Sequence, residues 1–225
     1  MGVSVFKHAV KRAVEGVGFD IRRMPWREDN QFLETYEVVR KHTLVDITRC
    51  WQLWDALTMA PSRGDIIEVG VWRGGTGCLL AKRAQEFGCK TFLCDTFSGV
   101  VKSGQWDNEY RDGEHRDAHP SYVSSLAAKL GVETEILQGI FPEETGHRIA
   151  DRAFRFAHID VDVYQSSRDA TEWVWPRLVS GGVVIFDDYG FERCEGVRKF
   201  VDEWAAETRC PVVHSVTSQA IVFRL

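Results

Sequence analysis

From residue 65 to the C-terminus, short apolar runs alternate with segments of helical periodicity. Five of these runs have the length of buried strands and are bounded by turn-forming residues: 65–71, 90–94, 132–137, 154–159 and 182–186. Apolar stripes at helical spacing lie between them, for example over 164–178 and 194–206. This alternation predicts an α/β fold in which helices cover a parallel sheet.

The last two apolar runs, 211–214 and 219–223, are only a few residues apart. So short a connection favours an antiparallel hairpin at the edge of the sheet. Together with the five parallel strands, the hairpin predicts a Rossmann-like, mostly parallel seven-stranded sheet. That outline alone fits many doubly wound folds.

The first 62 residues carry helical signals instead. Asp46 can cap a helix that contains Ile47, Trp51, Trp54 and Leu57, and 3–17 can form an amphipathic helix. We therefore expect two regions, a helical lid or oligomerisation region over 1–62 and the α/β domain over 63–225. The apolar character of the first region favours a homo-oligomer.

Composition excludes several classes of protein. With 28 Lys and Arg against 33 Asp and Glu, the net charge is −5, which disfavours nucleic acid as a partner. Six cysteines without a CxxC pair favour reduced thiols and a cytoplasmic location. No run approaches the roughly 18–20 apolar residues of a membrane span, and no signal-peptide hydrophobic region is present, so we expect no transmembrane segment.

A glycine-rich stretch, 68–76, lies where the first expected strand passes into a helix. Such a turn lets a nucleotide-like ligand approach backbone amides and a helix N-terminus. A dinucleotide fingerprint counted from Gly70 needs a second glycine where this chain has Trp72, so the sequence disfavours NAD. S-adenosylmethionine, which has no pyrophosphate, tolerates Trp72 and gains from the amides of Gly74 and Gly75. The alternative is a turn that merely packs helix on strand.

Two acidic residues near this turn are further candidates. Asp95 ends the second expected strand and can accept both ribose hydroxyls of an adenosine, although it can equally cap its own turn. Glu68 can contact the amino group of the ligand or simply hold the loop.

Four more aspartates end the fourth and fifth expected strands: Asp160, Asp162, Asp187 and Asp188. Sequential parallel strands are usually neighbours, so these carboxylates should converge at one edge of the sheet. Like charges so close need a cation or raised pKa values. Hard oxygen ligands point to Mg²⁺, with Mn²⁺ or Ca²⁺ as alternatives. Helix capping by Asp162 and Asp188 is the competing interpretation, and it explains only part of the cluster.

The longest segment without periodicity, 97–122, follows the second expected strand and predicts an active-site loop. His115 and His119 lie in it and could take a proton or hold a substrate hydroxyl. His42 and His158 are weaker candidates, because a lone histidine is more often an ordinary polar residue than a catalyst.

At these positions the sequence resembles the macrocin O-methyltransferase family, which includes enzymes that methylate deoxysugars of macrolide and aminocoumarin antibiotics. The resemblance covers roughly 40–205 and rests on five motifs, over 68–75, 95–99, 139–143, 159–164 and 181–190. It implies a class I S-adenosylmethionine-dependent methyltransferase fold. Where family members tend to have a Thr-Met lid segment preceded by Tyr, this chain has Lys-His-Thr-Leu over 41–44.

The resemblance also implies site residues. Asp162 would be the general base, and Asp160, Asp187 and Asp188 would bind Mg²⁺. The cofactor-binding residues expected in all are Glu68, Gly70, Val71, Trp72, Gly74, Gly75, Thr76, Asp95, Thr96, Gln138, Gly139, Ile140, Phe141 and Asp160.

The expected reaction is Mg²⁺-dependent transfer of a methyl group from S-adenosylmethionine to a sugar hydroxyl, in a glycoside natural product or a surface-glycan precursor. A vicinal diol suits chelation, and a bound cation lowers the pKa of the acceptor hydroxyl. A catechol or phenol O-methyltransferase, a metal-dependent hydroxylase on a related fold and a non-catalytic nucleotide-binding protein are the alternatives.

Overall fold

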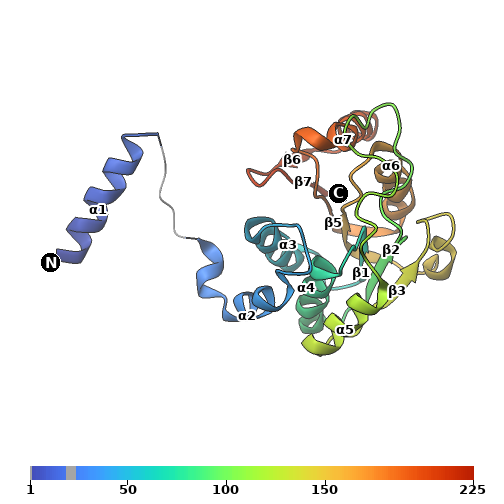
Figure 1. The fold of residues 1–225 in the computed structure, drawn as a ribbon, viewed down its shortest axis with the longest axis horizontal. Coiled ribbons are helices and arrows are strands. Elements are labelled where there is room, and N and C mark those ends of the chain that lie inside the picture. The colour runs from blue at the N-terminus through green and yellow to red at the C-terminus, as the bar shows by residue number, and fades with distance from the viewer. Residues whose placement is uncertain (1, 19–23) are drawn as a thin grey trace. The chain divides into compact units, whose positions relative to one another are not determined.

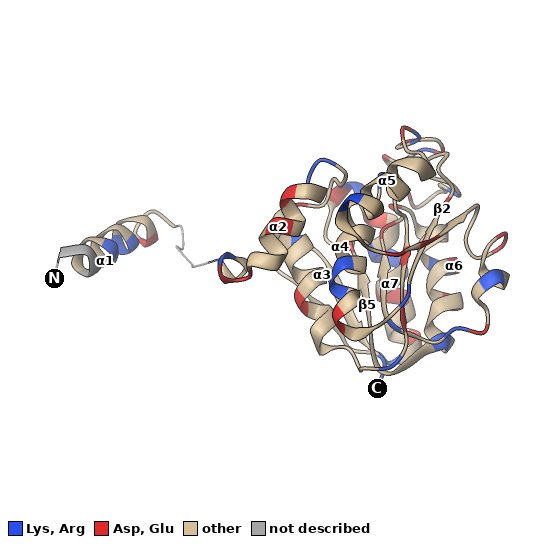
Figure 2. Ribbon diagram, turned by 90° about the horizontal axis from the view of Figure 1, so that it is seen from below, with Lys and Arg blue, Asp and Glu red and all other residues tan. Residues whose placement is uncertain are grey.

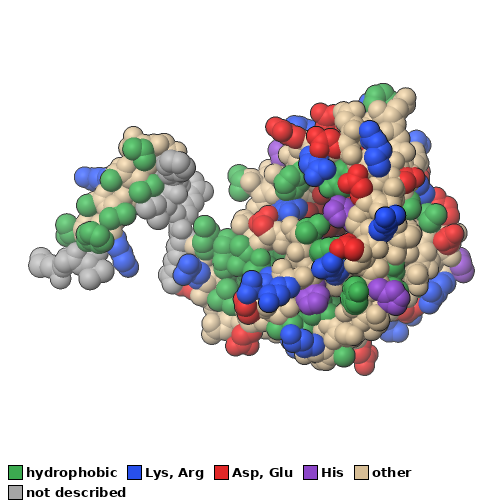
Figure 3. Space-filling model, viewed as in Figure 1, with side chains coloured by type: hydrophobic (Ala, Val, Ile, Leu, Met, Phe, Trp, Pro, Cys, Tyr) green, Lys and Arg blue, Asp and Glu red, His purple; other side chains and the backbone are tan. Residues whose placement is uncertain are grey.

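A computed structural model describes residues 2–18 and 24–225, which fall into two compact units, 1–33 and 34–225 (Figure 1). The first unit contains α1 (Gly2–Glu15) and a short 3-10 turn (Pro25–Glu28). Lys and Arg lie along α1 in Figure 2, and apolar side chains lie along it in Figure 3. Phe6, for example, is exposed. The amphipathic helix expected over 3–17 is thus confirmed as far as Glu15.

The second unit is built on a seven-stranded sheet of order β3-β2-β1-β4-β5-β7-β6. Its strands are β1 (Asp65–Val69), β2 (Thr91–Asp95), β3 (Glu135–Gln138), β4 (Phe154–Ile159), β5 (Leu178–Phe186), β6 (Val212–His214) and β7 (Ala220–Phe223). The first five are parallel, and β7 pairs antiparallel with both β5 and β6. The predicted sheet and terminal hairpin are confirmed.

Helices cover both faces of this sheet (Figure 1). On one face, α3 (Ile47–Met59) and α4 (Gly75–Ala84) bury Leu53, Leu57 and Leu80 against β1, β4 and β5, and α5 (Pro120–Leu130) packs on α4. On the other face, α6 (Tyr164–Val174) and α7 (Glu195–Thr208) bury Val174 and Phe200. The central strands β1, β4 and β5 therefore have apolar side chains on both faces, which explains the nearly continuous apolar runs of the sequence.

The boundaries of some elements differ from expectation. The helix expected over 164–178 ends at Val174, because a 3-10 turn at Trp175–Arg177 leads directly into a β5 that is longer than predicted. The compact unit begins at Glu34, within α2 (Asn30–Val39), so α3 belongs to the same body as the sheet. A lid or oligomerisation role for 1–62 stays a prediction. Among the residues that the structure describes, no helix is long and apolar enough to cross a bilayer.

Arg155, fully buried on β4, fastens α3 to the sheet. Its Nη2 donates to the carbonyl oxygens of Leu57 at 3.3 Å and Ala60 at 2.7 Å, which are at the C-terminal end of α3. The guanidinium also stacks on the ring of Phe87, 4.3 Å from its centroid. The last carbonyl groups of a helix have no hydrogen-bond donors within the helix, and Arg155 provides donors for two of them.

We expect Arg155→Met to lower the free energy of unfolding by roughly 2–4 kcal/mol, because it leaves two buried carbonyls without donors. Urea denaturation measures the change, and Arg63→Met, at an exposed position, serves as the control. Equal stability of the two variants would show that Arg155 does not hold α3.

Candidate active site

The turn after β1 lies directly against the end of β4. Gly70 has φ +88°, and a Cβ there would lie 1.7 Å from the carbonyl oxygen of Asp160. Only glycine permits this approach. The glycine-rich turn and the acidic edge of the sheet are therefore adjacent parts of one site.

A cavity of about 260 Å³ opens at this edge. Twelve of the residues expected from the sequence line it: Gly70, Val71, Trp72, Thr76, Asp95, Thr96, Gly139, Phe141, Asp160, Asp162, Asp187 and Asp188. Five others do not: Glu68, Gly74, Gly75, Gln138 and Ile140. The structure thus brings most of the expected site together in one place.

The glycine amides expected to serve the ligand already have partners. Gly74 N donates to the Val71 carbonyl at 2.8 Å, and Gly75 N donates to the His42 carbonyl at 2.9 Å. A Cβ at Gly75 would lie 2.6 Å from that same His42 oxygen. At these two positions glycine allows a neighbouring segment of the chain to approach closely. This role differs from the expectation that their amides bind the ligand.

Asp95 organises the turn from the neighbouring strand. Its Oδ2 accepts from the amides of Val71 at 2.6 Å and Trp72 at 2.8 Å, and its Oδ1 accepts from Phe97 N at 2.6 Å. Asp95 therefore holds two turns of the backbone. A carboxylate has about four lone-pair sites, so this leaves capacity for one further donor, such as a ribose hydroxyl.

Beneath the cavity, a chain of buried charges crosses the sheet. Glu68 on β1 and His158 on β4 are paired residues in the ladder, and His158 Nδ1 lies 2.8 Å from Glu68 Oε1. His158 Nε2 lies 3.4 Å from Oδ1 of Asp187, just beyond β5. Burial opposes protonation, but the hydrogen bonds to Asp187 and Glu68 outweigh it and raise the pKa of His158 to about 10. His158 is thus an imidazolium shared by two carboxylates.

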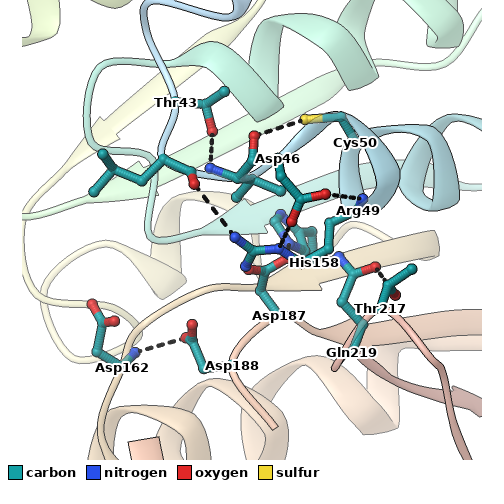
Figure 4. A network of polar contacts seen from close by, with 12 residues as sticks. Thr43, Asp46, Arg49, Cys50, His158, Asp162, Asp187, Asp188, Thr217 and Gln219 are labelled. Carbon is teal, nitrogen blue, oxygen red and sulfur yellow. Dashed lines mark hydrogen bonds and ion pairs between the residues drawn. The ribbon is translucent and has the colours of Figure 1, made fainter. Parts of the chain in front are cut away.

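Asp187 is held in place by several donors (Figure 4). Gln219 Nε2 donates to its Oδ1 at 2.6 Å, and Arg49 Nη1 from α3 donates to its Oδ2. Although burial opposes ionisation, His158 and Arg49 keep the pKa of Asp187 below its usual range. Asp187 is therefore a fixed carboxylate.

The other two members of the acidic cluster lack such compensation. Ligand oxygens of Asp160, Asp187 and Asp188 lie within 4.8 Å of one another. Burial, followed by repulsion from neighbouring carboxylates, raises the pKa values of Asp160 and Asp188 well above the ordinary range. Within the described part of the chain, Asp187 forms ion pairs, whereas Asp160 and Asp188 form none. Two uncompensated carboxylates beside a third fit a divalent cation with a preference for oxygen ligands.

Asp162 adjoins this cluster in a strained conformation. Its φ is +64°, and its amide donates to Asp188 Oδ2 at 3.2 Å. Burial raises the pKa of Asp162 to about 6, against the opposing effects of His115 and Tyr110. A half-buried carboxylate with a pKa this close to neutral is suited to general-base work.

The capping interpretation of these aspartates is wrong. The N-cap residue of α6 is Val163 and that of α7 is Cys194, and neither helix has a side-chain cap. Both residues instead line the cavity, where the Asp188 carboxylate accepts from the backbone amide of Asp162 (Figure 4).

The long loop expected to cover the site contains no helix or strand from Thr96 to His119. Five residues of the expected loop line the cavity: Gly99, Val100, Val101, Tyr110 and His115. His119 does not, because its Nδ1 accepts from Ser121 N at 3.2 Å and so caps α5. His42 supplies only its backbone carbonyl to the turn.

Several residues that were not predicted from the sequence also line the cavity: Arg49, Tyr110, Phe191, Arg193 and Cys194. Arg49 lies three residues after the capping Asp46, where it gave no signal of its own. Tyr110 lies inside the expected loop, and a search for hydroxyl donors there would have found it.

The strand order, the antiparallel β7, the glycine-rich turn after β1 and the acidic edge define a class I S-adenosylmethionine-dependent methyltransferase fold. The solved O-methyltransferase NovP has this fold, with a TM-score of 0.67 and 23% identity over 81% of this chain and 82% of that one. The model of the macrocin-O-methyltransferase family matches residues 35–224. The chain belongs to that family.

Two curated relatives are similar over part of their length. One is the 8-demethyl-8-(2,3-dimethoxy-alpha-L-rhamnosyl)-tetracenomycin-C 4'-O-methyltransferase of Streptomyces olivaceus, 30% identical over 144 residues, which are 58% of this chain and 55% of the relative. The other is the demethyldecarbamoylnovobiocin O-methyltransferase of Streptomyces niveus, 28% identical over 158 residues, 64% of this chain and 59% of the relative. The chain spans less than two thirds of either relative.

We expect His158→Leu to lower the free energy of unfolding by about 3–5 kcal/mol, because it leaves Glu68 and Asp187 as buried carboxylates without their shared cation. Urea denaturation is the measurement, with the exposed His147→Leu as control. The double variant Glu68→Leu, His158→Leu should recover part of the loss. A single variant as stable as the control would remove His158 from this role.

Proposed function

We propose that this protein transfers the methyl group of S-adenosylmethionine to a hydroxyl of a sugar, in a glycoside natural product or a surface-glycan precursor, with Mg²⁺ or Mn²⁺ as cofactor. One observation carries the proposal. Asp188 belongs both to the carboxylate cluster with Asp160 and Asp187 and to a second group with Asp162 and Cys194, each within 4.8 Å. The proposed metal site and the proposed base would therefore share one wall of a cavity that is also lined by the turn after β1.

The donor would lie along that turn. Gly70, Val71 and Trp72 would surround its methionine part, and Asp95 would accept from the ribose. Gly139 and Phe141, which follow β3 and line the same cavity, would border the adenine. Donor and acceptor would then meet above Asp160, at the point where the turn and the end of β4 touch.

Asp160, Asp187 and Asp188 would hold the divalent cation. When bound, the cation supplies Lewis acidity that lowers the pKa of the acceptor hydroxyl by several units. Asp162 accepts the hydroxyl proton at its carboxylate. The acceptor oxygen forms the new C–O bond as the sulfonium C–S bond breaks, and S-adenosylhomocysteine leaves. Alignment of the two substrates by the cavity accounts for much of the remaining acceleration.

The relatives support a sugar as acceptor, since the name of the tetracenomycin-C enzyme includes a rhamnosyl group and a 4'-O position. A cytoplasmic location is part of the proposal and fits the six free cysteines. The homo-oligomer expected from the N-terminal region is likewise a proposal. The candidate metal groups found among the described residues consist of carboxylates and Cys194, which favours oxygen-ligated Mg²⁺ over the histidine-ligated iron of a hydroxylase.

We expect the purified protein to bind S-adenosylhomocysteine with micromolar affinity in a calorimetric titration. Asp95→Asn should weaken this binding at least tenfold, because it loosens the backbone of the turn at Val71 and Trp72, whereas the exposed Asp151→Asn should have no effect. If the wild-type protein binds no S-adenosylhomocysteine, with Mg²⁺ or with a chelator, the methyltransferase proposal is wrong.

Asp162→Asn should lower the rate of methyl transfer by roughly 10² to 10⁴ while leaving the affinity for S-adenosylhomocysteine nearly unchanged, because an amide cannot accept the hydroxyl proton. A radiolabelled methyl donor measures transfer to a panel of deoxysugar glycosides, with catechols alongside. Near-normal turnover by the variant would remove Asp162 from the base role. Methylation of catechols alone would overturn the sugar assignment.

A further inference from the structure

Arg49 carries a positive charge from α3 into the acidic edge of the sheet (Figure 4). Only 8% of the residue is exposed, and its Nη1 donates to Asp187 Oδ2. Burial opposes its charge, but Asp187, Asp46 and Asp160 outweigh this and raise the pKa of Arg49. A permanent cation thus lies against one of the three carboxylates proposed to hold the metal.

The position of Arg49 is fixed by its own segment. Its Nε donates to Asp46 Oδ2 at 2.8 Å, and Asp46 also caps α3 by accepting from the amides of Thr48 and Arg49. Its Nη2 donates to the Leu44 carbonyl at 3.4 Å, and the guanidinium stacks on Phe191, 4.7 Å from the ring centroid. The guanidinium is therefore held beside the cluster by contacts that do not involve Asp187.

The carboxylate of Asp187 has little freedom to avoid this cation. Gln219 and His158 occupy Oδ1, at 2.6 Å and 3.4 Å. Gln219 is fixed in turn, because its Oε1 accepts from Gln52 on α3 at 2.7 Å. Oδ2 is thus the oxygen of Asp187 that remains for the cluster, and Arg49 already donates to it.

From this geometry we propose that Arg49 is a built-in counter-cation, which competes with the divalent ion for Asp187 Oδ2 and so sets the affinity of the site. The inference rests on the metal site of the proposed function. Two positive charges within a few ångströms repel strongly in a buried site. If the divalent ion displaces Arg49 from Asp187, Arg49 keeps an ion pair, because Asp46 remains as its partner. It also links metal binding to the segment from Leu44 to Arg49, which forms part of the cavity wall.

Arg49→Met tests the inference because it removes the charge and keeps an apolar side chain of similar length. Titration with Mn²⁺, followed by the electron paramagnetic resonance signal of the free ion, should show at least tenfold tighter binding than in the wild-type protein. Arg40→Met, which removes an exposed arginine paired with Glu37, is the matched control and should bind Mn²⁺ like the wild type.

Thermal unfolding gives a second readout. In EDTA, Arg49→Met should melt at a lower temperature than the wild type, because Asp187 loses its counter-ion, and saturating Mn²⁺ should raise its melting temperature by more than it raises that of the wild type. Should Arg49→Met fail to fold, Arg49→Lys decides the matter. It keeps the charge, so its Mn²⁺ affinity should stay within about threefold of the wild-type value, and a tenfold change in either direction would overturn the inference.

The possible results distinguish a failure of this inference from a failure of the proposed function. Mn²⁺ binding that is unchanged or weaker in Arg49→Met overturns the inference and leaves the metal site intact. Mn²⁺ binding by neither protein overturns both the inference and the metal site. The separate titration with S-adenosylhomocysteine then shows whether the methyl-donor site survives on its own.

Discussion

One of two buried cations at the acidic edge, the imidazolium of His158, fixes the geometry on which both halves of the site depend. The parallel register of β1 and β4 places it opposite Glu68, and the end of β5 brings Asp187 to its other nitrogen. Glu68 lies in turn under the first turn of α4, where a Cβ at Gly77 would come within 2.4 Å of its Oε2. The helix α4 and the carboxylate of Asp187 are thus positioned by the same ion, which lies in a buried part of the sheet.

The cavity above this ion concentrates strain and charge that a merely structural sheet edge would avoid. Trp72, His115 and Asp162 line it with φ values of +48°, +61° and +64°, in the left-handed region that non-glycine residues rarely adopt. The two cations in contact with the cluster, His158 and Arg49, satisfy Asp187 but leave Asp160 and Asp188 without counter-ions. The same edge therefore combines a constrained backbone, the raised pKa of Asp162 and an excess of negative charge that suits a divalent cation.

The pattern of apolar residues and the turn-forming residues predicted the sheet, because each buried strand is a local apolar run that ends at a recognisable turn. The convergence of Asp160, Asp187 and Asp188 followed from topology, since the carboxyl ends of neighbouring parallel strands meet at one edge. The roles of Glu68 and His158 did not follow, because they depend on the register between β1 and β4, which no local pattern specifies. Arg49 escaped prediction for a similar reason: its partner Asp187 is 138 residues away along the chain.

The segment before α3 shows why its unusual sequence is compatible with the family fold. Where family members tend to have a Thr-Met segment preceded by Tyr, this chain has Lys-His-Thr-Leu, yet the contact that joins the segment to α4 runs from Gly75 N to the carbonyl of His42, which any residue could provide. Thr43 contributes a local bond to Val45 N at 3.0 Å, and Leu44 offers its carbonyl to Arg49. Attachment therefore depends on backbone and on Arg49, so the side chains at 42–44 are free to differ where they face the cavity. The different residues at 41–44 therefore leave the joining of this segment to α4 unchanged, because that joining runs through a backbone hydrogen bond.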